Sequence, residues 1–296
     1  MENPRVYLLV AFSALFWGAN FVLAGPVLAD LSPEWAAASR FLLAAALMMG
    51  LAWSRGEALF GLARRHAGTY LLLGLVGIAA FNLLFFTALQ TTSASNGALI
   101  MATNPLLTAL LAAPLLGERP DMRQLAALPV ALLGVAVVIA QGDMTRLLGW
   151  KISVGDGLML AANLAWALYN VFSRRHMPAA SSVANTALIM LAGAVLLTLV
   201  AGGGGEPPAL PGAKALFALA AMVLGGTILA YLFWGMGIQH LGAGRTAIFL
   251  NLVPVFAMLI GAGLGTAPTP AQLVGGMLVL GAVSLTMLPS RRLAPA

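Results

Sequence analysis

The chain has 296 residues, of which 61% are hydrophobic and 8% are charged, and its mean hydropathy is +0.96. Because a soluble domain is about a quarter charged, this composition excludes a soluble protein and predicts an integral membrane protein with no separate soluble domain. The net charge of +6 is assigned to loop residues that anchor the chain at the membrane surface, and not to nucleic-acid binding. The absence of cysteine excludes disulfides and thiolate metal sites.

Apolar segments recur along the whole chain with short polar breaks between them. Each is long enough to cross, as a helix, the roughly 30 Å of hydrocarbon in a bilayer. Ser32 followed by Pro33 is typical of a helix start. The sequence therefore predicts an all-α membrane protein with ten transmembrane helices, over Arg5–Ala24, Glu34–Ser54, Gly68–Leu89, Ala94–Leu116, Met122–Gln141, Ser153–Ser173, Ser182–Ala201, Ala213–Ile238, Gly242–Leu264 and Thr269–Leu288.

The basic residues indicate how the chain is oriented. When the N-terminus is placed in the cytoplasm, most of the 15 lysines and arginines fall at cytoplasmic helix ends, as the positive-inside rule requires. Ten spans then return the C-terminus to the same side. Both termini are therefore predicted to be cytoplasmic.

An internal repeat relates the two halves of the chain. Several residues recur after 149 positions, namely Trp17 and Trp166, Gln90 and Gln239, and Pro105 and Pro254. Five spans in each half is an odd number, so the two halves must cross the membrane in opposite senses. This predicts an inverted-topology repeat, an architecture typical of secondary transporters. The expected halves are residues 1–145 and 150–290, followed by a cytoplasmic tail, 291–296.

Short motifs on several predicted helices identify a family. They are Trp17-Gly18-Ala19-Asn20-Phe21, Ser39-Arg40-Phe41-Leu42-Leu43-Ala44, Leu116-Gly117-Glu118-Arg119, Gly155-Asp156-Gly157-Leu158 and Trp166-Ala167-Leu168-Tyr169. Together they resemble the drug/metabolite transporter superfamily, in its ten-helix EamA-like branch. The second half departs from the pattern at Gly265-Thr266, where the first half has Gly117-Glu118. The resemblance implies export of metabolites or drugs across a bacterial inner (cytoplasmic) membrane, and the overall likeness is greatest to aromatic amino-acid exporters.

Polar and aromatic residues gather on single faces of several predicted helices, three or four positions apart. Trp17 and Asn20 share a face of the first helix, and Trp166 and Asn170 share a face of the sixth. Because lipid offers an amide no hydrogen-bond partner, we expect these faces to point into the bundle. The alternatives are that the tryptophans only anchor helices and that the asparagines only bond one helix to another. The predicted substrate-binding residues are Trp17, Asn20, Asn82, Phe85, Asn96, Thr103, Trp166, Asn170, Tyr231 and Trp234.

Two prolines and two arginines complete the candidate site. Pro105 and Pro254 are predicted to kink the fourth and ninth helices, either for gating or only for packing. Arg40 lies within a predicted span, where a charge is a functional hypothesis by default, and Arg245, at the start of the ninth span, is a second possible charge contact. A substrate carboxylate would suit Arg40 electrostatically. An arginine at this point is also part of the family pattern, so it could instead brace the fold.

The residue types that the predicted spans lack limit the transport mechanisms that are possible. No Asp or Glu lies deep in a predicted span, so we find no proton relay and expect facilitated export without proton coupling. A nucleotide-binding loop is absent, which argues against an ATP-driven pump. No cofactor and no metal are expected, and the lack of a nucleophile with a base argues against an intramembrane enzyme.

The sequence thus predicts an inner-membrane exporter of small metabolites, with aromatic amino acids as the expected solutes, that works by alternating access. Its expected partners are the solute and the lipid bilayer, and not nucleic acid. One alternative is a multidrug exporter of planar cationic compounds, whose cations aromatic faces would bind. Another is a receptor or assembly subunit that transports nothing. The solute, the coupling ion and the oligomeric state are left open.

Overall fold

The computed structural model describes residues 4–92, 100–101, 103–117, 122–140, 143, 153–204, 210–263 and 269–287. Every regular element in these ranges is a helix. Asn96 and the predicted tail 291–296 lie outside them. The elements are α1 (Pro4–Asp30), α2 (Pro33–Ser54), α3 (Leu59–Arg65), α4 (Ala67–Gly74), η1 (Leu75–Ala80), α5 (Phe81–Ala88), α7 (Asn104–Leu116), α8 (Met122–Ala140), α10 (Val154–His176), α11 (Ser182–Gly203), α12 (Ala213–Ala221), η2 (Met222–Leu229), α13 (Ala230–Leu241), α14 (Ala243–Ile248), η3 (Phe249–Asn251), α15 (Leu252–Gly263) and α16 (Pro270–Met287).

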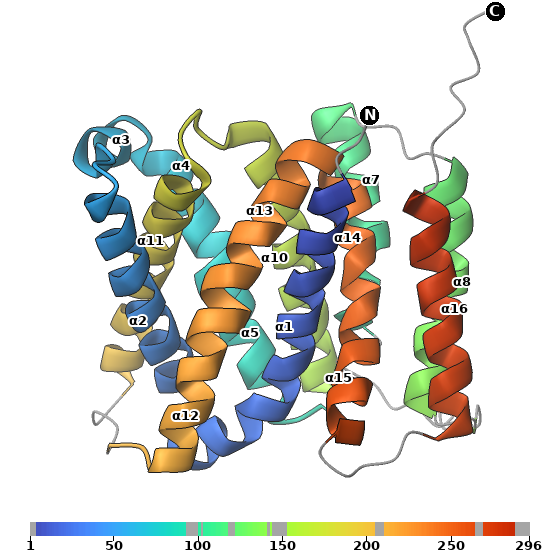
Figure 1. Ribbon diagram of the computed structural model, residues 1–296. Coiled ribbons are helices and arrows are strands. Elements are labelled where there is room, and N and C mark those ends of the chain that lie inside the picture. Colours follow the sequence, from blue (N-terminus) through green and yellow to red (C-terminus); the bar gives the residue numbers. More distant parts are fainter. Residues whose placement is uncertain are drawn as a thin grey trace, which may run out of the picture.

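Several of these helices can span a membrane. By length and apolar composition, five stretches within the described ranges qualify: Pro33–Ser54, Ala67–Ala88, Ser182–Gly203, Ala213–Leu241 and Ala243–Gly263. Helix α1, which bends by 44° along its length, would make a sixth. The all-helical membrane class is therefore confirmed, whereas ten crossings and the orientation of the termini stay predictions. The start of α1 and the end of α16 lie at the same end of the bundle (Figure 1).

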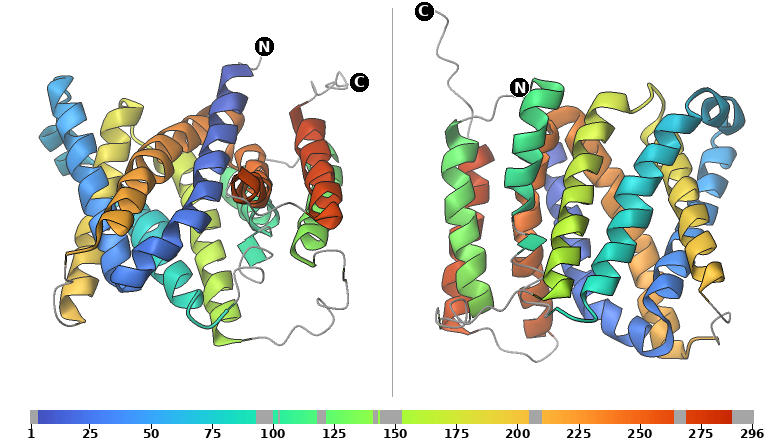
Figure 2. Two further views of the ribbon diagram at one scale, coloured as in Figure 1. Left: turned by 60° about the horizontal axis from the view of Figure 1, so that its bottom comes forward. Right: turned by 180° about the vertical axis from the view of Figure 1, so that it is seen from behind.

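Two long helices, α1 and α10, organise the centre of the bundle. Helix α1 packs against α13 and α15, and α10 packs against α5 and α7. The pair α2 and α11 lies on one side of this centre, and the pair α8 and α16 lies on the other (Figures 1 and 2). The buried face of α2 is rich in alanine, including Ala37, Ala44 and Ala45, which lets neighbouring helices approach closely.

A π-helical turn interrupts the α-helix at matching places in the two halves. The segment η1 lies between α4 and α5, and η2 lies between α12 and α13. A shift of 149 residues superimposes Gly77 of η1 on Gly226 of η2. A π-turn holds one residue more than an α-turn and is frequent at functional sites. The predicted spans included both segments but not their π-helical form, because one extra residue per turn leaves no mark on an apolar run.

Helix breaks occur at the two prolines that the sequence analysis expected to lie at kinks. Pro105 falls in the first turn of α7, directly after a turn at Thr103, and Pro254 falls in the first turn of α15, after the 3₁₀ segment η3. A proline in a first turn costs no hydrogen bond, because the first N–H groups of a helix have no partner within it. Pro105 thus lies at a helix start, whereas Pro254 follows a 3₁₀ segment within the continuous helical stretch Ala243–Gly263.

A capping box fixes the start of α10. The Ser153 Oγ accepts a hydrogen bond from the Asp156 backbone N at 3.1 Å, and Asp156 Oδ2 accepts one from the Ser153 N at 2.7 Å. The Thr92 hydroxyl, which follows α5, donates to the other Asp156 oxygen. The carboxylate therefore ties the start of α10 to the end of α5.

Asp156→Ala should lower the free energy of unfolding by about 1 kcal/mol, the usual cost of a lost cap. Asp156→Asn keeps one oxygen acceptor, so its free energy of unfolding should lie between that of Asp156→Ala and that of the unmodified protein. The thermal unfolding midpoint in detergent measures the effect. An unchanged midpoint for Asp156→Ala would show that the box contributes nothing to stability.

Candidate substrate site

Four aromatic side chains from three helices meet at the centre of the bundle. Trp17 comes from α1, Trp166 from α10, and Tyr231 and Trp234 from α13; we call these four the aromatic cluster. The Trp17 ring centroid lies 5.3 Å from that of Trp166 and 4.9 Å from that of Trp234. Trp166 meets Tyr231 nearly edge-on, at 5.6 Å and 83°. These separations and the edge-on arrangement are the favoured geometry of aromatic pairs.

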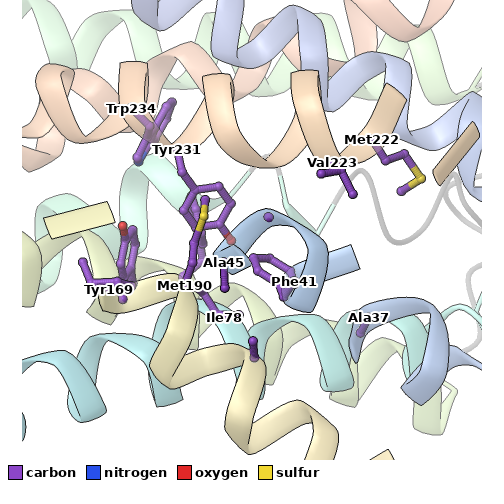
Figure 3. Close-up of a cluster of buried hydrophobic side chains, with 14 of the residues drawn as sticks. Ala37, Phe41, Ala45, Ile78, Tyr169, Met190, Met222, Val223, Tyr231 and Trp234 are labelled. Atoms are coloured by element: carbon purple, nitrogen blue, oxygen red, sulfur yellow. The ribbon is translucent and has the colours of Figure 1, made fainter. Parts of the chain in front are cut away.

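The cluster extends toward α2 and α11. Figure 3 shows Tyr231 directed toward Phe41 of α2, with Met190 of α11 nearby. The ring centroids of Tyr231 and Phe41 are 5.9 Å apart. On the other side, Phe81 of α5 packs against Trp166 at 5.0 Å. The rings therefore join helices of both predicted halves.

Burial distinguishes these tryptophans from membrane-surface anchors. The Trp234 side chain is fully buried and Trp166 is nearly so, whereas Trp17 is half-buried. Trp53, at the end of α2, is 81% exposed, as an interfacial anchor would be. The anchor alternative is therefore excluded for Trp166 and Trp234.

The two π-turns lie directly against this cluster, and each meets a side chain of the other half. A Cβ at Gly77 would lie 2.1 Å from a ring carbon of Tyr169, and a Cβ at Gly226 would lie 2.1 Å from the Asn20 Oδ1. Only glycine leaves room for such close approach.

The π-turn carbonyls accept hydrogen bonds from the cluster. Trp17 Nε1 donates to the Gly226 O at 3.0 Å, and the Tyr231 hydroxyl donates to the Gly77 O at 3.1 Å. The π-turns and the cluster thus form one unit.

A chain of buried amides leads from the cluster to the break before α7. Trp234 Nε1 donates to the Asn170 Oδ1 at 2.8 Å. The Asn170 amide nitrogen lies 3.4 Å from Thr108 Oγ1 and 3.5 Å from Asn104 Oδ1. Thr108 in turn donates to Asn104 at 3.0 Å. Asn104, Thr108, Asn163 and Asn170 are termed the amide network below.

Asn163 completes the network at the helix break itself. Its amide nitrogen donates to the Ile100 O and to the Thr103 Oγ1, both at 2.8 Å, and its Oδ1 accepts from Asn104 Nδ2 at 2.6 Å. The Asn163 side chain of α10 thus bonds on both sides of the break before α7, to Ile100 on one side and to Thr103 and Asn104 on the other.

The remaining predicted substrate residues differ in burial and in the partners that they contact. Asn82 is buried and donates to the Ile78 O of its own helix at 2.8 Å, and Phe85 packs against Phe81. Thr103 belongs to the edge of the amide network. Arg245 is half-buried near the start of α14.

Several residues of this site were missed or left out of the expected set. Asn104 and Thr108 lie one turn apart on α7, a spacing that indicates a polar face of this helix. Asn163 shares a face of α10 with Trp166 and Asn170. Phe81 has no polar group and Tyr169 is one aromatic residue among several in the apolar runs, so that spacing alone separates neither from a packing residue.

Arg40 is a buried cation at the side of the cluster. Only 6% of it is exposed. Its Nε donates to the Thr227 Oγ1 at 2.6 Å and its Nη2 to the Gly226 O at 3.2 Å. Its Cζ lies 5.1 Å from the Phe41 ring centroid. Within the described residues it has no carboxylate partner. Nor do the described residues include a group of three or more His, Asp or Glu side chains that could hold a metal ion.

Comparisons with known proteins place the chain among transporters. The model of the EamA-like transporter family matches twice, at residues 4–140 and 153–288. YyaM of Bacillus subtilis, named an uncharacterized transporter, is 38% identical over 95% of this chain and 92% of its own length. A Salmonella typhimurium protein named "Probable amino-acid metabolite efflux pump" is 29% identical over 96% of this chain and 95% of its own. A solved crystal structure has a TM-score of 0.81 at 23% identity, over 99% of this chain and all of that one, which shows a shared fold.

Proposed function

The chain belongs to the EamA-like transporter family, and from this premise we propose that it exports small metabolites, aromatic amino acids foremost, across the bacterial inner membrane. The observation that carries the proposal is the aromatic cluster with the adjoining amide network. Flat indole and phenol faces can stack on an aromatic solute. Amide groups and freed carbonyls beside them can bond its polar end. The Salmonella relative named for amino-acid metabolite efflux supports the same solute class.

We further propose that residues 1–145 and 150–290 form two inverted halves that alternate access to this site. The packing supports equivalent roles for the two halves. Helix α1 of the first half packs against α13 and α15 of the second, and α10 of the second half packs against α5 and α7 of the first. Under this proposal the breaks at Pro105 and Pro254 are the places where α7 and the α14–α15 segment flex. The solute would lie between α1, α10 and α13 while the halves rock.

Export is proposed to be facilitated and not proton-coupled. Among the described residues, the one buried acidic side chain is Asp156, and it is committed to the capping box of α10. A proton-coupled transporter needs a titratable group on the solute path. The same lack of a carboxylate beside the cluster disfavours a planar cation as the solute.

Trp17→Ala and Trp234→Ala should each slow tryptophan efflux from proteoliposomes at least about tenfold, because each removes two or more ring contacts from the cluster. Initial rates of labelled tryptophan efflux, with and without a pH gradient, measure this. Trp53→Ala is the matched control, since Trp53 is exposed at the end of α2 and has no ring contact with the cluster among the described residues, and should transport normally. Unchanged rates in both cluster variants would contradict the site. A chain that moves no solute would favour the receptor or assembly alternative.

A further inference from the structure

A buried guanidinium needs compensation that the fold around Arg40 does not supply. A charge removed from water is costly unless it is paired with an opposite charge and fully hydrogen-bonded. Arg40 is buried, yet no ion pair forms to it among the described residues. Its bonds go to a hydroxyl and to a backbone carbonyl, both of them neutral.

The donors of Arg40 are also incompletely used. A guanidinium carries five N–H donors in a planar fork that matches the two oxygens of a carboxylate. Nε bonds to Thr227 and Nη2 to Gly226, which leaves Nη1 without a hydrogen bond in the described part of the chain. The geometry keeps part of the fork available for an anion.

Two further unpartnered polar atoms belong to the same unit. Among the described residues, Trp166 Nε1 is a buried N–H donor with no acceptor, and Asn20 Oδ1 is a buried acceptor with no donor. Nearly all buried polar side-chain atoms in proteins have a partner, so such atoms need an explanation. Trp166 lies within the aromatic cluster, and the Asn20 amide rests on Gly226, whose carbonyl also accepts from Arg40.

These groups converge on one place. Asn20, Trp17 and Arg40 all contact Gly226, from α1 and α2. The Trp166 ring is 5.3 Å from the Trp17 ring, so its free N–H belongs to the same neighbourhood. The Arg40 cation and the free amide oxygen of Asn20 therefore lie at the π-turn of η2, and the free N–H of Trp166 belongs to the adjoining wall of aromatic rings.

We infer that this grouping is a recognition site for the head group of an α-amino acid. Arg40 and the Trp166 N–H bind the carboxylate, Asn20 Oδ1 accepts from the ammonium, and the aromatic cluster holds the side chain. The inference rests on the proposed function and deepens it, because it makes the carboxylate a requirement for transport. An amine of the same shape without a carboxylate is then rejected by the uncompensated Arg40 charge.

The rival account is that Arg40 only braces the π-turn. Its bonds to Thr227 and Gly226 do stabilise that turn. A brace would affect all solutes alike, whereas a recognition site affects solutes according to their carboxylate. The ratio of two transport rates therefore separates the two accounts, even where the total rate falls.

The test compares efflux of tryptophan, tryptamine and tryptophan methyl ester from proteoliposomes. The unmodified protein should move tryptophan at least about tenfold faster than either compound that lacks the carboxylate, given the strength of charge-assisted bonds. Arg40→Gln should abolish most of this preference, and Arg40→Lys should retain part of it. Thr227→Val is the matched control, because it removes a bracing bond and leaves the charge, and should keep the preference.

Trp166→Phe provides a second route that does not depend on an Arg40 variant being stable. It keeps a ring and removes the N–H, so it should slow tryptophan several-fold and leave the methyl ester unaffected. Equal rates for tryptophan and tryptamine in the unmodified protein would overturn the inference while leaving the exporter in place. An unchanged preference in Arg40→Gln would also overturn it. If none of the three compounds leaves the proteoliposomes, the proposed function itself is rejected, and the head-group site with it.

Discussion

Gly18→Val is expected to leave little folded protein, with a loss of about 3 kcal/mol or more in the free energy of unfolding. Gly18 is where α1 crosses α15. A Cβ placed there would lie 2.9 Å from the backbone N of Ala257, from the Phe256 Cβ and from the Val253 O. Backbone atoms cannot move aside as the end of a flexible side chain can. The two helices, which belong to different predicted halves, would have to separate.

Gly50→Val provides the matched control for this prediction. Gly50 lies within α2, and a Cβ there would meet no atom within 4 Å. Both variants change helix propensity equally, so that their difference isolates packing. Thermal midpoints and the yield of monodisperse protein in size-exclusion chromatography measure it. Equal midpoints for the two variants would mean that α1 and α15 do not approach as closely as they do in this structure.

Asn163→Leu should lower the free energy of unfolding by about 2 to 3 kcal/mol, since several buried partners lose their bonds together. The average side-chain bond between membrane helices contributes only about 0.6 kcal/mol. Asn163 differs because it holds the break before α7: without it, the Ile100 O and the Thr103 hydroxyl lose its amide, and Asn104 loses an acceptor.

Asn82→Leu is the corresponding comparison, because Asn82 is buried and donates its amide hydrogen bond to the Ile78 O, four residues earlier in the chain. It should cost less than about 1 kcal/mol. Unfolding monitored by tryptophan fluorescence compares the two variants. A loss in Asn163→Leu no larger than that in Asn82→Leu would show that the break before α7 does not depend on the amide network.

The helices themselves could be predicted because a bilayer imposes a simple rule on composition. A capping serine before an apolar run predicts where a helix starts, and α2 and α10 do begin one residue after Ser32 and Ser153. The proline positions also indicated where α7 and α15 depart from a regular helix. The form of the break before α7 depends on Asn163 of α10, which no local pattern in α7 reveals.

The site was predictable in its residue types and less so in its connections. Spacing along one helix placed Trp17 with Asn20 and Trp166 with Asn170. It could not show that Trp234 bonds to Asn170 or that Arg40 reaches Gly226, because those contacts join residues far apart in sequence. The free N–H donors of Arg40 could not be predicted from the sequence either, because they depend on how α2 packs against η2 in the assembled bundle.

The two π-turns also bear on how this sequence can change by insertion and deletion. Since each turn holds one residue more than an α-turn, it behaves as a one-residue insertion retained within a helix. Loss of that residue would restore α-helix and leave the segments on either side facing much as before, because the wider turn already takes up the extra residue. A one-residue loss within the α-helical part of α13 has no such compensation, and it would rotate everything beyond it by about 100°. Between Tyr231 and Trp234 such a loss would turn Trp234 away from its partners, so two deletions that an alignment records alike would have very different effects on the cluster.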